Sequence, residues 1–361
     1  MKNGDMIPIE TNVEPTELEF DLIAKEPLLW YEPEFQKELV IEGMKREIDS
    51  TKDFDVYDEV KVDLLTPEEL KNCIPTRWVH KPKGLAIKSR IVVKGYKEIV
   101  DDKDDTYAST PSVITLRLLL VLALAKNWYV LGADVSTAFL HATWTKATTY
   151  VWPPEEFYPG GGVAWRLKKA LYGLKSSPKL WQTHFATTMA KFDFVRCKSD
   201  SNLHKHVDGD LFVLCYVDDM LIVGKEDKAK ATFDILSTEL LMKSTGTLSK
   251  EGDKLDFLGR QLSRSHDSIF IGMDDAYVAK ILAEANMSSC RPANTPGTDA
   301  LKRTVEEEEE LDALSHREYR KVVGQLLWLT TVRPDLAYAV KDFLEEHPSP
   351  HLSTQGSSSA C

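Results

Sequence analysis

The hydrophobic pattern of the chain is clearest at residues 211–224. Two apolar runs there flank the adjacent polar pair Asp218 and Asp219, and Gly224 closes the second run. Runs of this length, rich in valine, leucine and isoleucine and bounded by polar residues, are typical of buried β-strands. The pattern therefore predicts a β-hairpin with both carboxylates at its turn.

A second apolar run, at residues 128–133, ends in Asp134. The residues that follow, 135–140, predict a tight turn that leads into a helix. Asp134 is then at the end of a strand. It lies beside the Asp218–Asp219 turn if the two segments pair in one sheet.

The spacing of apolar residues predicts most of the remaining elements. Thr66 and Pro67 are typical of a helix start, with threonine as the N-cap and proline in the first turn. Alternating residues at 77–94 predict a hairpin with Lys88, Arg90 and Lys94 along one side. Helices are expected at residues 34–48, 115–126, 178–192, 228–241, 274–287, 318–330 and 334–343, and short strands at 150–154 and 163–167.

Length and composition narrow the class of protein. The 361 residues allow one large domain or two to three smaller ones, and 43% hydrophobic with 28% charged residues is typical of a soluble globular protein. No apolar run is long enough to span a bilayer, and the acidic N-terminus does not resemble a signal peptide. The five cysteines form no Cys-x-x-Cys pair, which predicts free thiols. We therefore expect an intracellular protein with no membrane partner.

The net charge of −12 is unfavourable for a nucleic-acid-binding protein until its distribution is considered. Residues 1–70 carry 20 acidic and 7 basic residues, whereas residues 71–300 carry 26 acidic and 31 basic residues. The middle of the chain is thus mildly basic, which permits a basic groove along a phosphate backbone.

The adjacent carboxylates also carry the first chemical hypothesis. Two carboxylates at the ends of hydrophobic strands repel each other unless a cation neutralises them. A divalent-metal site is therefore the first interpretation of Asp218 and Asp219, and an ordinary Asp-Asp turn is the alternative. Metal-dependent phosphoryl transfer needs a further acid, and Asp134 is the candidate.

These residues carry a resemblance to a known family. Tyr216-Val217-Asp218-Asp219, together with Asp134 and residues 135–140, resembles the reverse transcriptase of copia-type LTR retrotransposons. Further stretches are similar to the family in the same order along the chain, at residues 88–96, 171–178 with Trp181, 257–259, 319–324 and 333–339. One short motif is weak, but a series of ordered blocks over residues 35–347 is specific.

The resemblance implies an α+β fold built as a right hand, with fingers, palm and thumb. A mixed palm sheet would carry the catalytic aspartates. The implied division is a disordered or linker arm at residues 1–30, fingers and palm at 31–265, a helical thumb or connection region at 266–347, and a disordered tail at 348–361.

The resemblance also implies an RNA-directed DNA polymerase, a nucleotidyltransferase that adds dNTPs to a primer 3′-hydroxyl. Asp134, Asp218 and Asp219 would be the catalytic residues and, with the carbonyl of Val135, would hold two Mg²⁺ ions, with Mn²⁺ as an alternative. The implied nucleotide-binding residues are Lys88, Arg90, Ser136, Thr137, Ala138, Phe139, Tyr172 and Gly173. The implied primer–template contacts are Lys175, Tyr216, Phe257, Leu258 and Gly259.

Two of these roles compete with simpler interpretations of the same residues. Lys88 and Arg90 fit a solvated strand face by pattern alone, and Phe139 fits the core side of a helix. By resemblance, the two cations would neutralise the triphosphate, and the Phe139 ring would exclude a 2′-hydroxyl from the incoming sugar.

The partners that the resemblance implies are an RNA template, a DNA primer and dNTPs. The family's polymerase is part of a larger Pol polyprotein with integrase and ribonuclease H, and no protease, zinc-knuckle or integrase motif occurs in these 361 residues, so a truncated unit is expected. The expected location is the cytoplasm, in virus-like particles, with nuclear access left open.

A non-catalytic retrotransposon relic or nucleic-acid-binding remnant is the alternative function. An unrelated two-metal nuclease would leave Phe139 and residues 171–178 unexplained.

Overall fold

The computed structural model describes residues 37–99, 106–291 and 312–346. The segments expected to be disordered, 1–30 and 348–361, lie outside these residues. The first half of the chain forms α2 (Lys37–Asp53), β1 (Tyr57–Lys61), α3 (Pro67–Asn72), β2 (Ile74–Lys83), β3 (Ala86–Val93), α4 (Val113–Ala125), β4 (Tyr129–Val135), α5 (Ala138–His141), β5 (Tyr150–Trp152) and β6 (Val163–Leu167).

The second half continues with a helix, four strands and a further helix before the C-terminal elements. These are α6 (Ser177–Ala190), β7 (Phe194–Arg196), β8 (Leu203–His206), β9 (Leu211–Tyr216), β10 (Asp219–Gly224) and α7 (Glu226–Glu239). Then follow β11 (Met242–Leu248), β12 (Lys254–Phe257), β13 (Arg260–Arg264), β14 (Ile269–Gly272), α8 (Asp275–Glu284), α9 (Ala313–Leu329) and α10 (Ala337–Glu346).

A six-stranded sheet in the order β11-β4-β10-β9-β8-β7 carries the three candidate aspartates. All of its pairs are antiparallel, because short turns join β7 through β10 in succession. The mixed pairing expected for this sheet occurs instead in the five-stranded sheet β1-β6-β5-β2-β3, where β2 and β5 run parallel.

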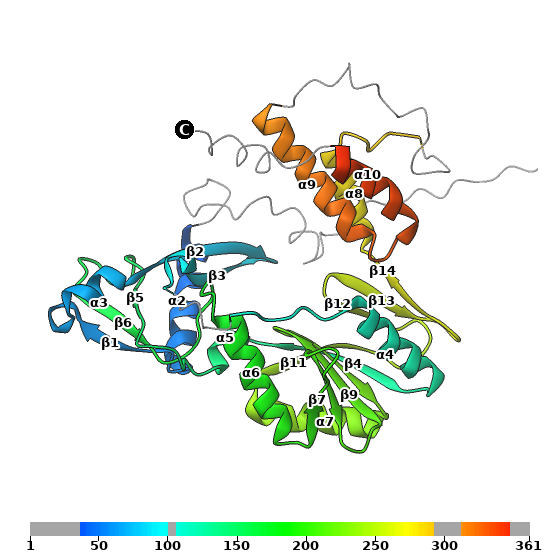
Figure 1. Ribbon diagram of the computed structural model, residues 1–361, viewed down its shortest axis with the longest axis horizontal. Helices are drawn as coiled ribbons and strands as arrows, with labels where there is room; N and C mark the ends of the chain where they lie inside the picture. Colours follow the sequence, from blue (N-terminus) through cyan, green and yellow to red (C-terminus); the bar gives the residue numbers. More distant parts are fainter. Residues whose placement is uncertain (1–36, 100–105, 292–311, 347–361) are drawn as a thin grey trace, which may run out of the picture.

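Both faces of the six-stranded sheet are covered (Figure 1). One face packs on α6 and α7 through residues that include Leu131, Ile222 and Trp181. The other face packs on α4 and on the three-stranded sheet β12-β13-β14 through Val130, Leu221 and their neighbours. Burial on both sides explains why the two aspartate-ending segments are almost wholly apolar, as the sequence pattern indicates.

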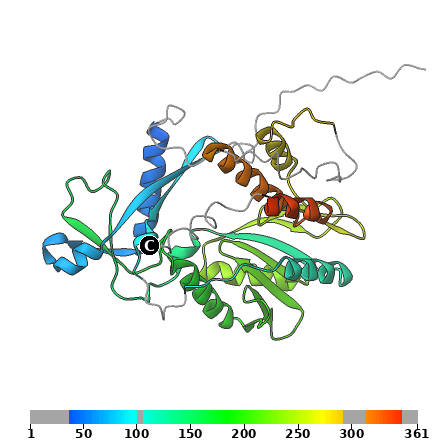
Figure 2. The same cartoon turned by 45° about the horizontal axis from the view of Figure 1, so that its top comes forward.

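The long β2–β3 hairpin projects from the five-stranded sheet and rests on α2. Residues Val40 and Met44 of α2 pack against Ile87 of β3. The C-terminal helices α8, α9 and α10 lie beside the three-stranded sheet, on the same side of the molecule as this hairpin (Figures 1 and 2). Both projecting regions therefore extend from the same side of the molecule, with the six-stranded sheet below them in Figure 1.

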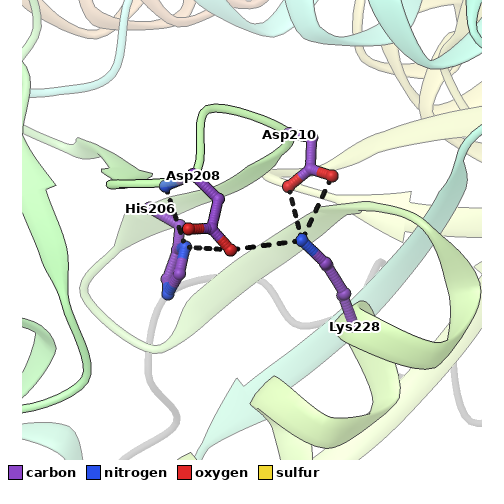
Figure 3. A network of polar contacts seen from close by, with 4 residues as sticks. All are labelled: His206, Asp208, Asp210 and Lys228. Atoms are coloured by element: carbon purple, nitrogen blue, oxygen red, sulfur yellow. Dashed lines mark hydrogen bonds and ion pairs between the residues drawn. The ribbon is translucent and has the colours of Figure 1, made fainter.

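A polar network holds the β8–β9 turn to α7 at the end of the sheet far from the aspartates (Figure 3). The Nζ atom of Lys228 lies 3.0 Å from Oδ1 of Asp210 and 3.3 Å from Oδ2 of Asp208, and Asp208 in turn contacts His206. The network is solvent-accessible, so its contribution to stability is small.

The predicted elements are largely confirmed. Thr66 caps α3 in a capping box with Glu69, the 77–94 hairpin is present, and each predicted helix and strand that lies within the described residues is found within a few positions. The described cysteines, Cys73, Cys197, Cys215 and Cys290, are free thiols. Among the described residues, no helix combines the length and hydropathy needed to cross a membrane.

Candidate active site

Strand pairing brings Asp134 and Asp219 together. β4 and β10 are antiparallel neighbours, and in their register Asp219 is the direct partner of Asp134. Side chains alternate along a strand, so Asp134 shares a face with Val130, and Asp219 shares the same face with Leu221. Both carboxylates therefore point toward the side of the sheet that carries α4 and the β12–β13 hairpin.

Asp218 is held in the two-residue turn between β9 and β10. Val217, the first residue of the turn, adopts a left-handed backbone conformation with φ +54°. The backbone N–H of Val135 donates a hydrogen bond to the carbonyl oxygen of Asp218 at 2.8 Å. This bond joins the end of β4 to the turn, so all three aspartates lie at one end of the same strand pair.

Burial and two neighbouring acids shift the pKa of Asp219. Burial, and then the negative charges of Asp218 and Asp134, raise the pKa of Asp219 to about 6, and the backbone N–H of Leu258 acts in the opposite direction. The Nζ atom of Lys243 lies 3.4 Å from Oδ2 of Asp134. Lys243 is opposite Asp134 in the β11–β4 register, a position that no sequence motif indicates.

The chemistry of this donor set suits a hard divalent cation. Within residues 37–99, 106–291 and 312–346, no group of three or more acidic, histidine or cysteine side chains is arranged so that it could hold a metal ion. Carboxylate oxygens are nevertheless the ligands that Mg²⁺ uses in proteins, and a cation would offset the charges of Asp218 and Asp134, which add to burial in raising the pKa of Asp219. Asp134, Asp218 and Asp219 therefore fit such an ion by the type of their ligand atoms, although their three carboxylates are not gathered around one point in this structure.

The β2–β3 hairpin contributes a basic pocket of about 350 Å³, lined by Val79, Lys81, Pro82, Lys83, Lys88 and Arg90. Desolvation, and then the positive charges of Arg90 and Lys83, lower the pKa of Lys88, whereas the charge of Asp134 acts in the opposite direction. Lys88, Arg90 and Lys83 therefore repel one another. An anion with several charges, such as a triphosphate, would remove this repulsion.

A short aromatic series connects the basic pocket to the aspartate end of the sheet. The guanidinium carbon of Arg90 lies 4.7 Å from the centre of the Tyr172 ring, and the Phe139 ring meets Tyr172 edge-on at 5.2 Å. Phe139 is only partly buried, on the short helix α5 that follows Asp134. Three predicted nucleotide-binding residues from separate segments thus contact one another.

The remaining predicted residues of this group lie in the same turn. Thr137 is left-handed, with φ +53°, and its hydroxyl donates to the Ser136 carbonyl at 2.7 Å. Ala138 is buried at the start of α5. The turn therefore changes the chain direction sharply between Asp134 and Phe139.

The loop that carries Tyr172 and Gly173 is pressed against the end of β3. A Cβ atom at Gly95 would overlap the carbonyl oxygen of Gly173, and a Cβ atom at Gly173 would overlap that of Val93. Gly173 also has φ +91°, which favours glycine. No other residue type fits this approach of two backbones.

Glu98 holds the same loop in place through hydrogen bonds. The sequence pattern did not indicate this residue. Its buried carboxylate accepts hydrogen bonds from the backbone N–H of Lys175 and from the Ser176 hydroxyl, the latter at 2.8 Å. The Nζ atom of Lys175 donates to the Glu98 carbonyl at 3.2 Å. Lys175, predicted to contact primer–template, is thus partly engaged within the protein.

The predicted primer-contact hairpin lies close to the aspartate end of the sheet, where the Leu258 backbone N–H acts on Asp219. Phe257 is buried in the core with Leu262, whereas Leu258 and Gly259 form the turn between β12 and β13, both with positive φ. Any contact with nucleic acid at this hairpin would therefore come from its turn and not from the Phe257 ring. Tyr216 lines a different hollow, of about 460 Å³, together with Phe139 and Trp181.

Comparison with known proteins is consistent with this geometry. The family model described as reverse transcriptase (RNA-dependent DNA polymerase) matches residues 55–299. The retrovirus-related Pol polyprotein from transposon RE2 of Arabidopsis thaliana is 32% identical over 260 residues, which cover 70% of this chain and 17% of that protein. The corresponding polyprotein from transposon TNT 1-94 of Nicotiana tabacum is 30% identical over 346 residues, 88% of this chain and 24% of that protein.

A shorter relative, the putative transposon Ty5-1 protein of Saccharomyces cerevisiae, is 30% identical over 235 residues, 61% of this chain and 72% of that protein. A solved structure of apo telomerase from Candida Tropicalis covers 64% of this chain with a TM-score of 0.38 and 11% identity, too low a similarity to support an argument. The chain spans only 17–24% of the two plant polyproteins. The family predicted from the sequence is confirmed: the chain belongs to the reverse transcriptase (RNA-dependent DNA polymerase) family.

Proposed function

We propose that this chain is an RNA-directed DNA polymerase that adds dNTPs to the 3′-hydroxyl of a primer. The observation that carries the proposal is the register of β4 and β10, which places Asp134 opposite Asp219 with Asp218 in the adjoining turn. In this proposal the six-stranded sheet with its helices is the palm and the five-stranded sheet is the fingers, both within residues 31–265. Helices α8–α10, within residues 266–347, are the thumb.

Asp134, Asp218 and Asp219, with the carbonyl of Val135, would hold two Mg²⁺ ions, or Mn²⁺ as the alternative. When bound, such ions lower the pKa of the attacking hydroxyl and neutralise the charge that develops on the leaving pyrophosphate. The strand register and the adjoining turn keep the three aspartates at one end of the β4–β10 pair, so that their carboxylates can converge on bound ions.

The other residues of the site would position the incoming nucleotide. Lys88 and Arg90 would bind its phosphates, and the stacking of Arg90 on Tyr172 orients the guanidinium for this contact. Phe139, which packs edge-on against Tyr172, would lie under the sugar. The turn at Leu258 and Gly259 would contact the primer end near Asp219.

The proposed partners are an RNA template and a DNA primer, in a Pol polyprotein that also carries integrase and ribonuclease H. The proposed location is intracellular, in cytoplasmic virus-like particles with access to the nucleus. The polyprotein context is supported by the Pol polyproteins to which the chain is similar, and the location rests on the family resemblance alone.

Primer extension tests the proposal directly. Purified protein, an RNA template, a DNA primer, dNTPs and Mg²⁺ should yield extended primer. Asp218→Asn should reduce the rate by about 100- to 1000-fold, the scale for removing one electrostatic stabiliser of a transition state. Asp234→Asn is the matched control, because Asp234 is exposed on α7.

The outcomes separate the proposal from its alternative. Extension that survives Asp234→Asn and is lost with Asp218→Asn supports the polymerase. Binding of primer–template by a folded chain that extends nothing would favour the non-catalytic, nucleic-acid-binding remnant.

A further inference from the structure

We propose that Trp181 is a positioning residue that sets the conformation of the catalytic turn through its indole N–H. The inference rests on the proposed polymerase function, because it concerns how Asp218 is held for that reaction. Trp181 belongs to the segment that resembles the family, but neither the motif nor the pattern gives it a role.

The contact itself is specific. The Nε1 atom of Trp181 donates a hydrogen bond to the carbonyl oxygen of Val217 at 2.8 Å. That carbonyl belongs to the peptide unit that joins Val217 to Asp218. Its direction therefore fixes the backbone angles on both sides of the bond and, with them, the direction in which the Asp218 side chain leaves the turn.

The turn needs such a partner because its backbone is strained. Val217 has φ +54°, a conformation that is rare for any residue other than glycine and most unfavourable for a β-branched one. The surroundings must impose this conformation. On the inner side of the turn, the thiol of Cys215 is 3.7 Å from the same carbonyl, a weak interaction. The indole N–H is thus the strong donor to this oxygen among the described contacts.

Packing alone leaves one side of the turn poorly supported. A hollow of about 460 Å³ is lined by Val217, Tyr216, Trp181 and neighbouring residues. Side chains beside an open space hold their positions less firmly than side chains in a filled core. A directed hydrogen bond can supply the orientation that packing does not.

Trp181 is itself rigid, so it can transmit a fixed position. The side chain is 2% exposed, and its ring lies 5.7 Å from that of Phe185 and 6.1 Å from that of His141. It projects from α6, a helix of 14 residues packed on the six-stranded sheet. The hydrogen bond therefore fixes the position of the catalytic turn relative to a helix that is packed in the core.

The test removes the donor, and the control that follows removes the same ring volume from elsewhere in the core. Trp181→Phe retains an aromatic ring and removes the N–H, which leaves the Val217 carbonyl with no strong partner. We expect kcat for primer extension to fall about tenfold, in line with the loss of one buried hydrogen bond. KM for dNTP and the affinity for primer–template should change by no more than about twofold, because neither ligand contacts the indole in this proposal.

Trp144→Phe is the matched control. The Nε1 atom of Trp144 also donates to a backbone carbonyl, that of Ala147 at 3.1 Å, and the side chain is also buried, but it is not at the turn. The control removes the same kind of bond from the same core. It should therefore lower thermal stability comparably and leave kcat within about twofold of the unsubstituted chain.

Two further measurements keep the inference testable. Hydrogen exchange, read by mass spectrometry on a peptide that spans residues 216–220, should accelerate with Trp181→Phe and not with Trp144→Phe. If Trp181→Phe fails to fold, 3-benzothienylalanine at position 181 keeps the shape of the indole and replaces its N–H with sulfur. The same fall in kcat is expected from it.

A double-substitution cycle with Val217→Asn isolates the strain. Asparagine tolerates a positive φ better than valine, so the turn should depend less on its partner, and Trp181→Phe should cost less in kcat on this background. Unchanged kcat and exchange in the variant at position 181, or equal losses in both tryptophan variants, would overturn the inference alone. An unsubstituted chain without activity would overturn the proposed function and the inference together.

Discussion

His204 is a buried histidine on β8, opposite Val213 of β9, and it makes stability depend on pH. The side chain is 1% exposed, and its interaction with the Asn202 backbone only partly offsets the cost of a charge at this position. Burial, and then the charge of Arg196, lower the pKa of His204 from its usual 6.5 to about 4. The folded chain therefore keeps this imidazole neutral where the unfolded chain protonates it.

The sign of the effect follows from the lowered pKa. Above pH 6.5 His204 is neutral in both states, so its titration costs the folded state nothing. Between pH 6.5 and about 4 only the unfolded state binds the proton. The free energy of unfolding therefore decreases as the pH is lowered through this range, by up to about 3 kcal/mol. The free energy of unfolding, measured by denaturant titration, should therefore fall less steeply over this range in His204→Phe.

The comparison is between the unsubstituted chain and His204→Phe, measured at each pH. Other groups titrate in the same range, so the quantity to compare is the difference between the two chains at each pH. A constant difference from pH 7 to pH 4 would show that His204 is protonated as easily when folded as when unfolded.

Phe139 should determine which sugar the site accepts. In the proposed function its ring lies under the incoming sugar, where it leaves no room for a 2′-hydroxyl. Phe139→Ala should lower the preference for dNTPs over rNTPs by about 10- to 100-fold, the range in which a pocket separates substrates that differ by one small group. The measurement is kcat/KM for matched dNTP and rNTP incorporation.

The control is Phe192→Ala, which removes the same side chain from a position packed on the same core but beyond the end of α6. It should destabilise the protein without changing sugar preference. If the unsubstituted chain and Phe139→Ala show the same preference for dNTPs over rNTPs, the Phe139 ring does not contact the incoming sugar.

At the scale of residues, the sequence indicates the motif side chains but not those that support them. Asp134, Asp218 and Asp219 stand out because each is a polar residue at the end of an apolar run. Lys243 and Glu98 are ordinary charged residues in sequence, and only the strand register and the fold of the chain bring them to the site. The donor role of Trp181 likewise depends on the direction of one carbonyl group, which no residue pattern encodes.

At the scale of elements, the junction between β3 and the Tyr172 loop is set by two glycines. Gly95→Ala would place a methyl group on the Gly173 carbonyl, and the backbone would have to separate. We expect a loss of about 2–3 kcal/mol in the free energy of unfolding, as for other overpacked sites, and a higher KM for dNTP because Tyr172 and Arg90 would move apart.

Gly324→Ala provides the contrast. Gly324 lies inside α9, and nothing lies within 4 Å of an added Cβ atom. Alanine there should stabilise the helix by about 0.5–1 kcal/mol and leave KM unchanged. Thermal unfolding and steady-state kinetics on both variants check the pair, and a fully stable Gly95→Ala would show that the two segments can separate without cost.

The elements that the sequence did not predict share a physical cause. β11 has the sequence Met-Lys-Ser-Thr-Gly-Thr-Leu, with alternation too weak for a strand, and it forms because β4 offers an unpaired edge. β1 is short and lies at the edge of the five-stranded sheet, where it pairs with β6. Strands of this kind depend on a neighbour far along the chain, whereas buried strands and amphipathic helices carry their pattern in their own residues.

At the scale of the whole molecule, two projecting regions border the aspartate end of the six-stranded sheet. The hairpin β2–β3 carries the basic pocket, and the C-terminal helices meet the sheet β12-β13-β14 on the other side (Figure 2). The family resemblance predicts fingers, palm and thumb with limits at residues 31–265 and 266–347, and this division stays a prediction. How they meet the central sheet depends on contacts between distant residues, such as the one from Arg117 to the Thr331 carbonyl at 2.9 Å, which local patterns do not contain.

The contact between the C-terminal helices and the β12–β13 hairpin centres on Arg260. This side chain is 4% exposed; its guanidinium carbon lies 4.2 Å from the centre of the Trp328 ring, and its Nη2 donates to the Thr331 hydroxyl at 3.2 Å. If α8–α10 act as a thumb, Arg260 joins it to the hairpin whose turn would contact the primer. A desolvated cation–π contact contributes about 2 kcal/mol, enough to hold the two together.

Arg260→Met removes the charge and retains most of the side-chain volume. We expect single-nucleotide addition to continue near the normal rate, because the aspartates and the basic pocket are untouched, while the number of nucleotides added per binding event falls several-fold. Primer extension in the presence of excess competitor duplex measures that number. Arg333→Met is the control, since Arg333 is exposed and pairs with Asp335 within the same C-terminal segment. Equal product lengths for Arg260→Met and the unsubstituted chain would mean that the C-terminal helices need no contact at Arg260 to retain the duplex, whereas a selective loss would connect their docking to processive synthesis.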